Sequence, residues 1–216
     1  MFKTLLTVLP LDLAATLSPG ILALTLFLLG SKKNGIPRIL ALLGGAIFTA
    51  TIIAVAGFFL GSLNPSQAKP GIISELVDIV LGIILILFGI KVFFGKENRI
   101  KLNNDGNKIR IIKWFAIGVV VNITNFDAVL LSFAAAHEVG RSSLAVFDKL
   151  FIVIFNMLFF ILPITLPLTL TLLFPRIADK ILTKLNGYVI KYSKYIVSLL
   201  FIVFGIYLLS RVIKIF

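Results

Sequence analysis

Two aspartates lie inside long apolar stretches of this sequence, where an ionisable side chain is costly to place. Asp12 lies near the start of the first stretch, and Asp127 lies in the middle of a later one. A charged side chain at the centre of a bilayer costs about 2.5 to 3.5 kcal/mol on insertion scales, which makes each aspartate a candidate binding residue. Neither has a Lys or Arg within one helical turn. The partner of each must therefore be another helix, a bound cation or a proton.

The stretch around Asp127 holds further polar side chains. Asn122, Thr124 and Asn125 all precede it closely. Asn122 and Asn125 are three residues apart, so in a helix their side chains lie on the same face, and both are candidates for contacting a substrate. Thr124 has a simpler explanation, because a threonine in a membrane helix often bonds only to the carbonyl one turn earlier.

The stretch around Asp12 contains a predicted helix break. Thr16 shares a helical face with Asp12, and Ser18, Pro19 and Gly20 follow. Proline removes a backbone donor and glycine loosens a helix, so carbonyl groups near this point are left free. Within a bilayer such groups are tolerated only inside protein or along a water-filled cavity, which makes Ser18 a candidate substrate contact. The alternative for Asp12 is a position close enough to the outer boundary to be hydrated.

Other marked positions are explained by helix shape and packing. Pro163 and Pro167 are four residues apart on one face and predict a bend or a break, acting either as a hinge or as a fixed kink. The second apolar stretch carries a stripe of small residues that predicts close helix packing. The stripe comprises Gly44, Gly45, Ala46, Ala50 and Ala54.

The remaining ionisable residues form no recognisable enzyme or metal site. The chain has one histidine and no cysteine, and no glycine-rich phosphate loop precedes a helix. We therefore expect no enzyme activity, no metal and no cofactor. His137 and Glu138 are expected to be solvated at the outer end of their stretch, and Asp78, with Glu75, is expected near the outer end of another.

The composition indicates what kind of element positions these residues. Of the 216 residues, 59% are hydrophobic and 14% are charged, whereas a soluble domain carries roughly 25% charged residues. The formal net charge is +12, but the basic residues lie in short runs between apolar stretches. Such runs orient membrane proteins and meet anionic headgroups. Membrane lipids are therefore the expected partners, and nucleic acid is not.

Six apolar stretches are long enough to cross a bilayer, which takes about 20 predominantly apolar residues. They predict an all-α membrane protein with six transmembrane helices, separated by polar runs around Asn34, Ser66 and Asp105 and by Pro175 with the run 180–187. The stretches are 4–29, 37–60, 73–94, 113–136, 150–174 and 192–213.

The distribution of Lys and Arg predicts the orientation, because cytoplasmic loops carry an excess of both. The first, third and fifth loops with their helix ends hold 15 of these residues, and the opposite side holds 6. We therefore expect a multi-pass protein of the cell membrane, with both termini outside the cytoplasm and the long basic loop inside.

The two halves of the chain share a pattern. The Phe-Gly-Ile ending of the third stretch recurs in the sixth, and the polar break after Leu17 in the first is matched after Ile123 in the fourth. With three spans per half, the second half enters from the opposite side, which is an inverted repeat. The predicted organisation is a first three-helix repeat at 1–95, a basic cytoplasmic loop at 96–112 and a second repeat at 113–216. The simpler alternative is that any two apolar stretches look alike.

Several short motifs are distributed over nearly the whole chain in the order of a known exporter family. They are Thr16-Leu17-Ser18-Pro19-Gly20-Ile21, Leu43-Gly44-Gly45, Leu87-Phe88-Gly89, Asn122-Ile123-Thr124-Asn125 and Leu166-Pro167-Leu168. In these motifs the sequence resembles the LysE superfamily of six-span exporters, and within it the GAP/Sap group of sulfolipid- and glycopeptidolipid-addressing proteins. Many relatives carry Asn-Pro where this chain has Asn125-Phe126, which predicts a less sharp second break. The thiol-transfer branch, which needs cysteines, is excluded.

The resemblance implies a secondary exporter of a small solute or lipid-linked molecule, coupled to a cation or a proton. In this interpretation Asp12 and Asp127 bind the coupling ion near mid-membrane, and the nearby polar side chains contact the substrate. Those side chains are Ser18, Asn122 and Asn125. The alternative is a non-transporting membrane scaffold that helps to assemble or localise a lipid-export system. A homodimer is compatible with both.

Overall fold

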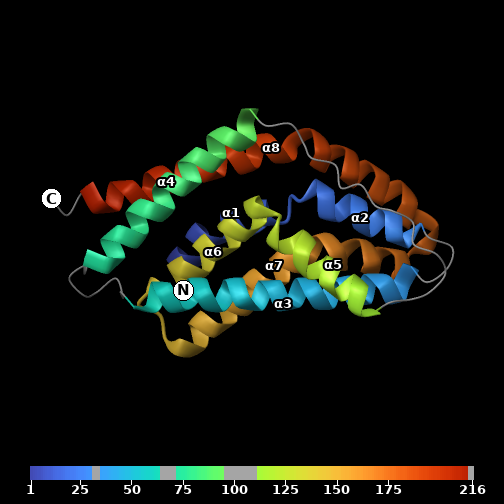
Figure 1. Cartoon of the computed structure of the whole chain (residues 1–216), viewed down its shortest axis with the longest axis horizontal. Coiled ribbons are helices and arrows are strands. Elements are labelled where there is room, and N and C mark those ends of the chain that lie inside the picture. Colours follow the sequence, from blue (N-terminus) through green and yellow to red (C-terminus); the bar gives the residue numbers. More distant parts are fainter. Residues whose placement is uncertain (31–34, 64–71, 95–110, 214–216) are drawn as a thin grey trace.

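The computed structural model describes residues 1–30, 35–63, 72–94 and 111–213. Within these ranges the chain forms eight helices and no strands, which confirms the all-α prediction (Figure 1). The predicted polar runs around Asn34, Ser66 and Asp105, and the basic loop up to residue 110, lie outside the described residues. The helices are α1 (Phe2–Ala15), α2 (Pro19–Leu29), α3 (Gly35–Ser62), α4 (Ile72–Phe94), α5 (Ile111–Ile123), α6 (Phe126–Arg141), α7 (Val146–Leu173) and α8 (Pro175–Ile213).

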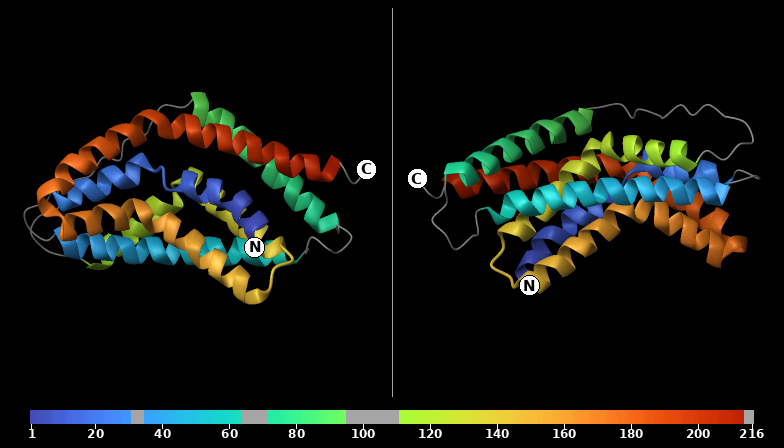
Figure 2. Two further views of the ribbon diagram at one scale, coloured as in Figure 1. Left: turned by 180° about the vertical axis from the view of Figure 1, so that it is seen from behind. Right: turned by 60° about the horizontal axis from the view of Figure 1, so that its bottom comes forward.

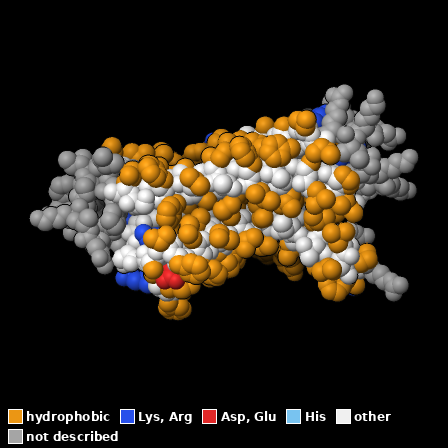
Figure 3. Space-filling view, turned by 90° about the horizontal axis from the view of Figure 1, so that it is seen from below, with side chains coloured by type: hydrophobic (Ala, Val, Ile, Leu, Met, Phe, Trp, Pro, Cys, Tyr) orange, Lys and Arg blue, Asp and Glu red, His pale blue; other side chains and the backbone are white. Residues whose placement is uncertain are grey.

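The described helices have the character of a membrane protein. α3 and α7 are each 28 residues long and apolar enough to cross a bilayer, and the number of spans rises to four if each of two bent helix pairs counts as one. Hydrophobic side chains cover the middle of the face in Figure 3, and most of the charged ones visible there lie toward its ends. The predicted membrane character is therefore confirmed, whereas six spans remain a prediction.

Both predicted helix breaks are present. α1 meets α2 at an angle of 53°, and α5 meets α6 at 73°. The expectation that the second break would be less sharp is wrong. Asn125 leaves the helical conformation without the help of a proline, with φ −79° and ψ 66°, because asparagine competes with helical hydrogen bonding.

Of the bend or break predicted at Pro163 and Pro167, the structure shows no break. α7 continues without interruption through Pro163 and Pro167, and both side chains are buried. Neighbouring helices allow a buried membrane helix to tolerate the lost backbone bonds. α8 also continues without interruption from Pro175 to Ile213. Pro175 does not disturb it, because proline at the first helical position lacks an N–H that would have no partner there anyway. The run 180–187, predicted as part of a loop, is therefore helical.

The helices of the two halves are interleaved. α3 packs against α5 and α6, α7 packs against α1 and α2, and α4 lies along α8 (Figures 1 and 2). The small residues of α3 allow this close approach: a Cβ added at Gly57 would come within 2.6 Å of the Phe133 carbonyl oxygen. Ala46, Ala50 and Ala54 are all buried. The predicted packing stripe is confirmed.

Two apolar clusters lie on either side of the breaks. One contains buried residues of α1 and α6 together with α3, α4, α7 and α8. The other contains buried residues of α2, α3 and α7, with partly buried side chains of α5 packed against it. The breaks between α1 and α2 and between α5 and α6 therefore lie between two packed cores.

Candidate functional site

The two helix breaks meet inside the molecule. Asn125 donates a hydrogen bond from Nδ2 to Oγ of Ser18 over 3.0 Å, across 107 residues of sequence. Each of these residues immediately precedes a helix, α2 in the case of Ser18 and α6 in the case of Asn125, and neither side chain caps its own helix. Ser18 is only 4% exposed. Two residues predicted separately as substrate contacts are thus brought together.

This contact places two helix N-termini beside each other. The first N–H groups of a helix have no partner within it, and they carry a partial positive charge. Because Ser18 and Asn125 bond to each other, their side chains leave these groups without a cap. Pro19 and Gly20 form the first two positions of α2, so only one of these two residues offers an N–H. Such ends favour a negatively charged group, and at the end of α6 Asp127 in the first turn already supplies one.

Asp12 lies in a buried polar cluster formed by three helices. Its side chain on α1 is 1% exposed, so the alternative of a hydrated position is wrong. Its Oδ1 accepts a hydrogen bond of 2.6 Å from Nδ2 of Asn156 on α7. Oδ1 of Asn156 in turn accepts one of 2.9 Å from the Ser132 hydroxyl on α6. Oδ2 of Asp12 has no hydrogen-bond partner in this cluster.

Asp127 has different surroundings. It lies half-buried in the first turn of α6, where a carboxylate complements the helix dipole. Its electrostatic partner is Lys91 on α4, whose ammonium group also lies 5.2 Å from the centre of the Phe88 ring. No hydrogen bond or ion pair of the described residues joins Asp127 to Asp12. Among the described residues, Lys91 therefore acts electrostatically on Asp127, without an ion pair between the two.

The other predicted polar residues divide into two kinds. Asn122 is fully buried; its Nδ2 donates to the Gly118 carbonyl over 2.8 Å, while its Oδ1 has no partner. Thr124 and Thr16 donate only to carbonyls of their own helices. Asn122 therefore offers a free acceptor one turn before the second break, whereas the threonines follow the simpler explanation.

Asn156 and Ser132 were missed by the sequence reasoning, although both are 1% exposed and hold Asp12. Asn156 lies between Phe155 and Met157, within the otherwise apolar run 150–164 of α7. A lone amide in such a place was a usable signal, because a polar side chain in a membrane helix needs a partner on a neighbouring helix.

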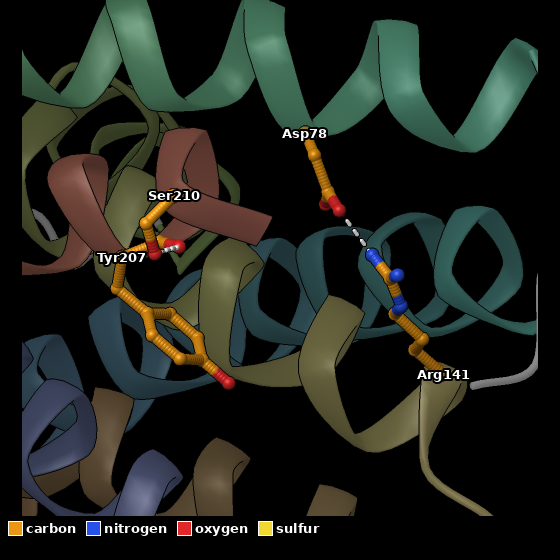
Figure 4. A network of polar contacts seen from close by, with 4 residues as sticks. All are labelled: Asp78, Arg141, Tyr207 and Ser210. Carbon is orange, nitrogen blue, oxygen red and sulfur yellow. Dashed lines mark hydrogen bonds and ion pairs between the residues drawn. The ribbon is translucent and has the colours of Figure 1, made fainter. Parts of the chain in front are cut away.

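A second polar contact lies at the far end of α6. Arg141 donates to the carboxylate of Asp78 on α4, and the pair is buried (Figure 4). Asp78 was expected near the outer end of its stretch with access to the interface, but it forms a buried ion pair instead.

His137 is 3% exposed and lies against the Phe133 ring, so the expectation of a solvated histidine is wrong. Figure 4 also shows Ser210 donating to the backbone of Tyr207 on α8.

The family of the chain follows from its comparison with known proteins. The family model described as Sap, sulfolipid-1-addressing protein, matches residues 8–214. The chain belongs to this family. The match spans both helix breaks and all of the polar clusters described above, and it confirms the Sap part of the resemblance seen in the sequence. Placement of this Sap-family chain in the LysE superfamily remains a prediction. No curated protein and no solved structure matches it.

Proposed function

We propose that this Sap-family chain is a secondary transporter that exports a lipid-linked anion or a small anionic solute across the cell membrane. The observation that carries the proposal is the hydrogen bond between Asn125 and Ser18. It brings two broken helices together at a buried point. Discontinuous helices whose half-helix ends meet near mid-membrane are the usual substrate sites of secondary transporters.

The order of the helices supports an inverted repeat with six spans. Each half of the chain begins with a broken pair, continues with a helix of 28 residues and ends with one further helix. The long helix of each half packs against the broken pair of the other. The start of α1 and the end of α8 lie toward the same end of the molecule (Figure 1). An even number of spans requires this last relation.

The chemistry of the breaks supports an anionic substrate group. The N-terminus of α2, whose first turn holds no acidic residue, favours negative charge, and Ser18, Asn122 and Asn125 offer hydrogen bonds beside it. The printed description of the family names a sulfolipid. A sulfate or another anionic headgroup on a lipid is therefore the substrate class that fits both observations. Its export is coupled, in this proposal, to the movement of a proton or a cation.

The second candidate is a membrane scaffold that helps to localise a lipid-export system. The word "addressing" in the family description favours it. In a scaffold the bond between Asn125 and Ser18 is a fixed strut that holds the two halves together, and the breaks do not move.

Reconstitution separates the two candidates. Liposomes that contain the purified chain and a fluorescent sulfated glycolipid are treated with an impermeant quencher, with and without a pH gradient, and the matched neutral glycolipid is the control. A transporter moves the sulfated lipid between leaflets and leaves the neutral lipid in place. If both lipids stay in place while the chain is correctly inserted, export of a lipid-linked anion is contradicted and the scaffold is favoured.

A further inference from the structure

The cluster of Asp12, Asn156 and Ser132 has the construction of a binding site rather than of a simple packing contact. It joins α1, α7 and α6, and each of the three side chains is 1% exposed. Two of its hydrogen bonds connect side chains of different helices, so the position of Asp12 depends on how these helices lie. One carboxylate oxygen, Oδ2, is left without a hydrogen-bond partner.

The orientation of the Asn156 amide is fixed by its neighbours. Its nitrogen reaches both Oδ1 of Asp12 at 2.6 Å and the Ser132 carbonyl at 3.3 Å, and both of these atoms are acceptors. Its oxygen accepts from the Ser132 hydroxyl at 2.9 Å. A reversed amide would lose the two bonds that its nitrogen donates, while the Ser132 hydroxyl can either donate or accept. Asp12 therefore faces an N–H donor, and the amide oxygen is turned away from it.

This orientation does not suit a metal cation. A hard cation is held by several converging oxygens, whereas the nearest polar group to the carboxylate presents hydrogen atoms that repel positive charge. Among the described residues, no group of three or more His, Cys, Asp or Glu residues could hold a metal ion. What remains available on Asp12 is one oxygen, which is enough for one proton.

Among the described residues, no ion pair compensates a carboxylate at Asp12. Of the charged groups on the helices packed against α1, Arg141 pairs with Asp78 and Lys149 donates to the Gly140 carbonyl. The described titratable groups on these helices are Asp127, His137, Glu138 and Arg141 of α6, Asp148 and Lys149 of α7, and Lys180, Lys184, Tyr188, Lys191, Tyr192, Lys194, Tyr195 and Tyr207 of α8. Asn156 is the side chain that bonds to Asp12. Burial without a counter-charge favours the neutral form of a carboxyl over the carboxylate.

We propose that Asp12 is the proton-binding residue of this protein, with Asn156 and Ser132 as positioning residues that hold its carboxyl between α1, α6 and α7. A proton from water forms an O–H bond at Oδ2, and the same proton returns to water when the carboxylate re-forms. Asn156 keeps its hydrogen bond to Oδ1 in both states. Coupling of this step to export rests on the proposed function, whereas the binding of the proton does not.

Infrared difference spectroscopy tests the proton directly and needs no substrate. The purified full chain in lipid films is moved between acidic and alkaline buffer, and the carbonyl stretch of a protonated carboxyl is followed in H₂O and D₂O. The proposal predicts one such band from a buried group that is lost in Asp12→Asn and kept in the matched variant Asp127→Asn. Asn156→Leu keeps the band and shifts it, because the bond to Oδ1 is removed.

Two results would overturn the proposal. One is a band that persists in Asp12→Asn, provided that this variant elutes as the same monodisperse species as the wild type. The other is a spectrum that responds to replacement of Na⁺ by choline at constant pH and loses this response in Asp12→Asn, which indicates a cation site. If Asp12→Asn does not fold, Asp12→Glu retains a carboxyl and must move the band. A protein that binds the proton but moves no lipid contradicts the proposed transport alone.

Discussion

The amide of Asn125 bonds to the hydroxyl of Ser18 over 3.0 Å, although 107 residues separate them. Each residue lies at a helix break, and the two side chains bond to each other instead of capping the helices that follow them. The two halves of the chain are therefore joined at the point where each is least regular.

The bond between these breaks has a measurable energy. Interhelical side-chain hydrogen bonds in membrane proteins average about 0.6 kcal/mol in double-mutant cycles, with a maximum of about 1.7 kcal/mol. We expect Ser18→Ala and Asn125→Ala to show a coupling free energy in this range when unfolding in mixed micelles is measured. The same cycle with Ser18→Ala and Thr124→Ala is the control and should give none, because Thr124 bonds within its own helix.

Close packing of α3 on α6 depends on a missing side chain. A Cβ at Gly57 would lie 2.6 Å from the Phe133 carbonyl oxygen, which backbone atoms cannot relieve without moving a helix. We expect Gly57→Ala to lower the free energy of unfolding by about 1 to 3 kcal/mol, as overpacking does. Gly187→Ala is the matched control, since nothing lies within 4 Å of its added Cβ. Equal stability of the two variants would contradict the observed packing.

The buried pair of Arg141 and Asp78 makes a prediction about charge. Removing one partner of a buried ion pair costs about 3 to 5 kcal/mol, whereas replacing both by apolar residues is often neutral. We therefore expect Arg141→Met to lower the thermal stability strongly and the double variant with Asp78→Leu to recover most of it. If the double variant is no more stable than the single one, the pair does not link α4 to α6.

The orientation can be checked at both ends of the chain. The excess of basic residues in the odd-numbered loops predicts that Met1 and Phe216 lie outside the cytoplasm. A reporter that is active only in the cytoplasm should be inactive at either end and active when inserted at Asp105. A cytoplasmic reporter signal at one end and not at the other would exclude an even number of spans.

The breaks and the packing stripe were predictable because their causes are local. Proline at position 19 and asparagine at position 125 disturb a helix wherever it lies, and small residues spaced one turn apart favour close packing. The partners were not predictable, because they come from distant segments: Asn156 is 144 residues from Asp12. His137 shows the same limit. The sequence predicted a solvated side chain at the end of a span. Gly57 and Gly61 have no side chains, however, so α3 packs directly against the backbone at His137.

The proposed transport requires the meeting point of the two breaks to open in turn to each side of the membrane. The chain has no cysteine, so a single Asn125→Cys can be labelled without background. Right-side-out and inside-out vesicles are treated with an impermeant maleimide. Phe2→Cys, at the exposed start of α1, is the control for one-sided access, and Ala134→Cys, at a position 1% exposed, is the control for a closed interior. Alternating access predicts that Asn125→Cys is labelled from both sides, whereas labelling from one side only, or from neither, would contradict it.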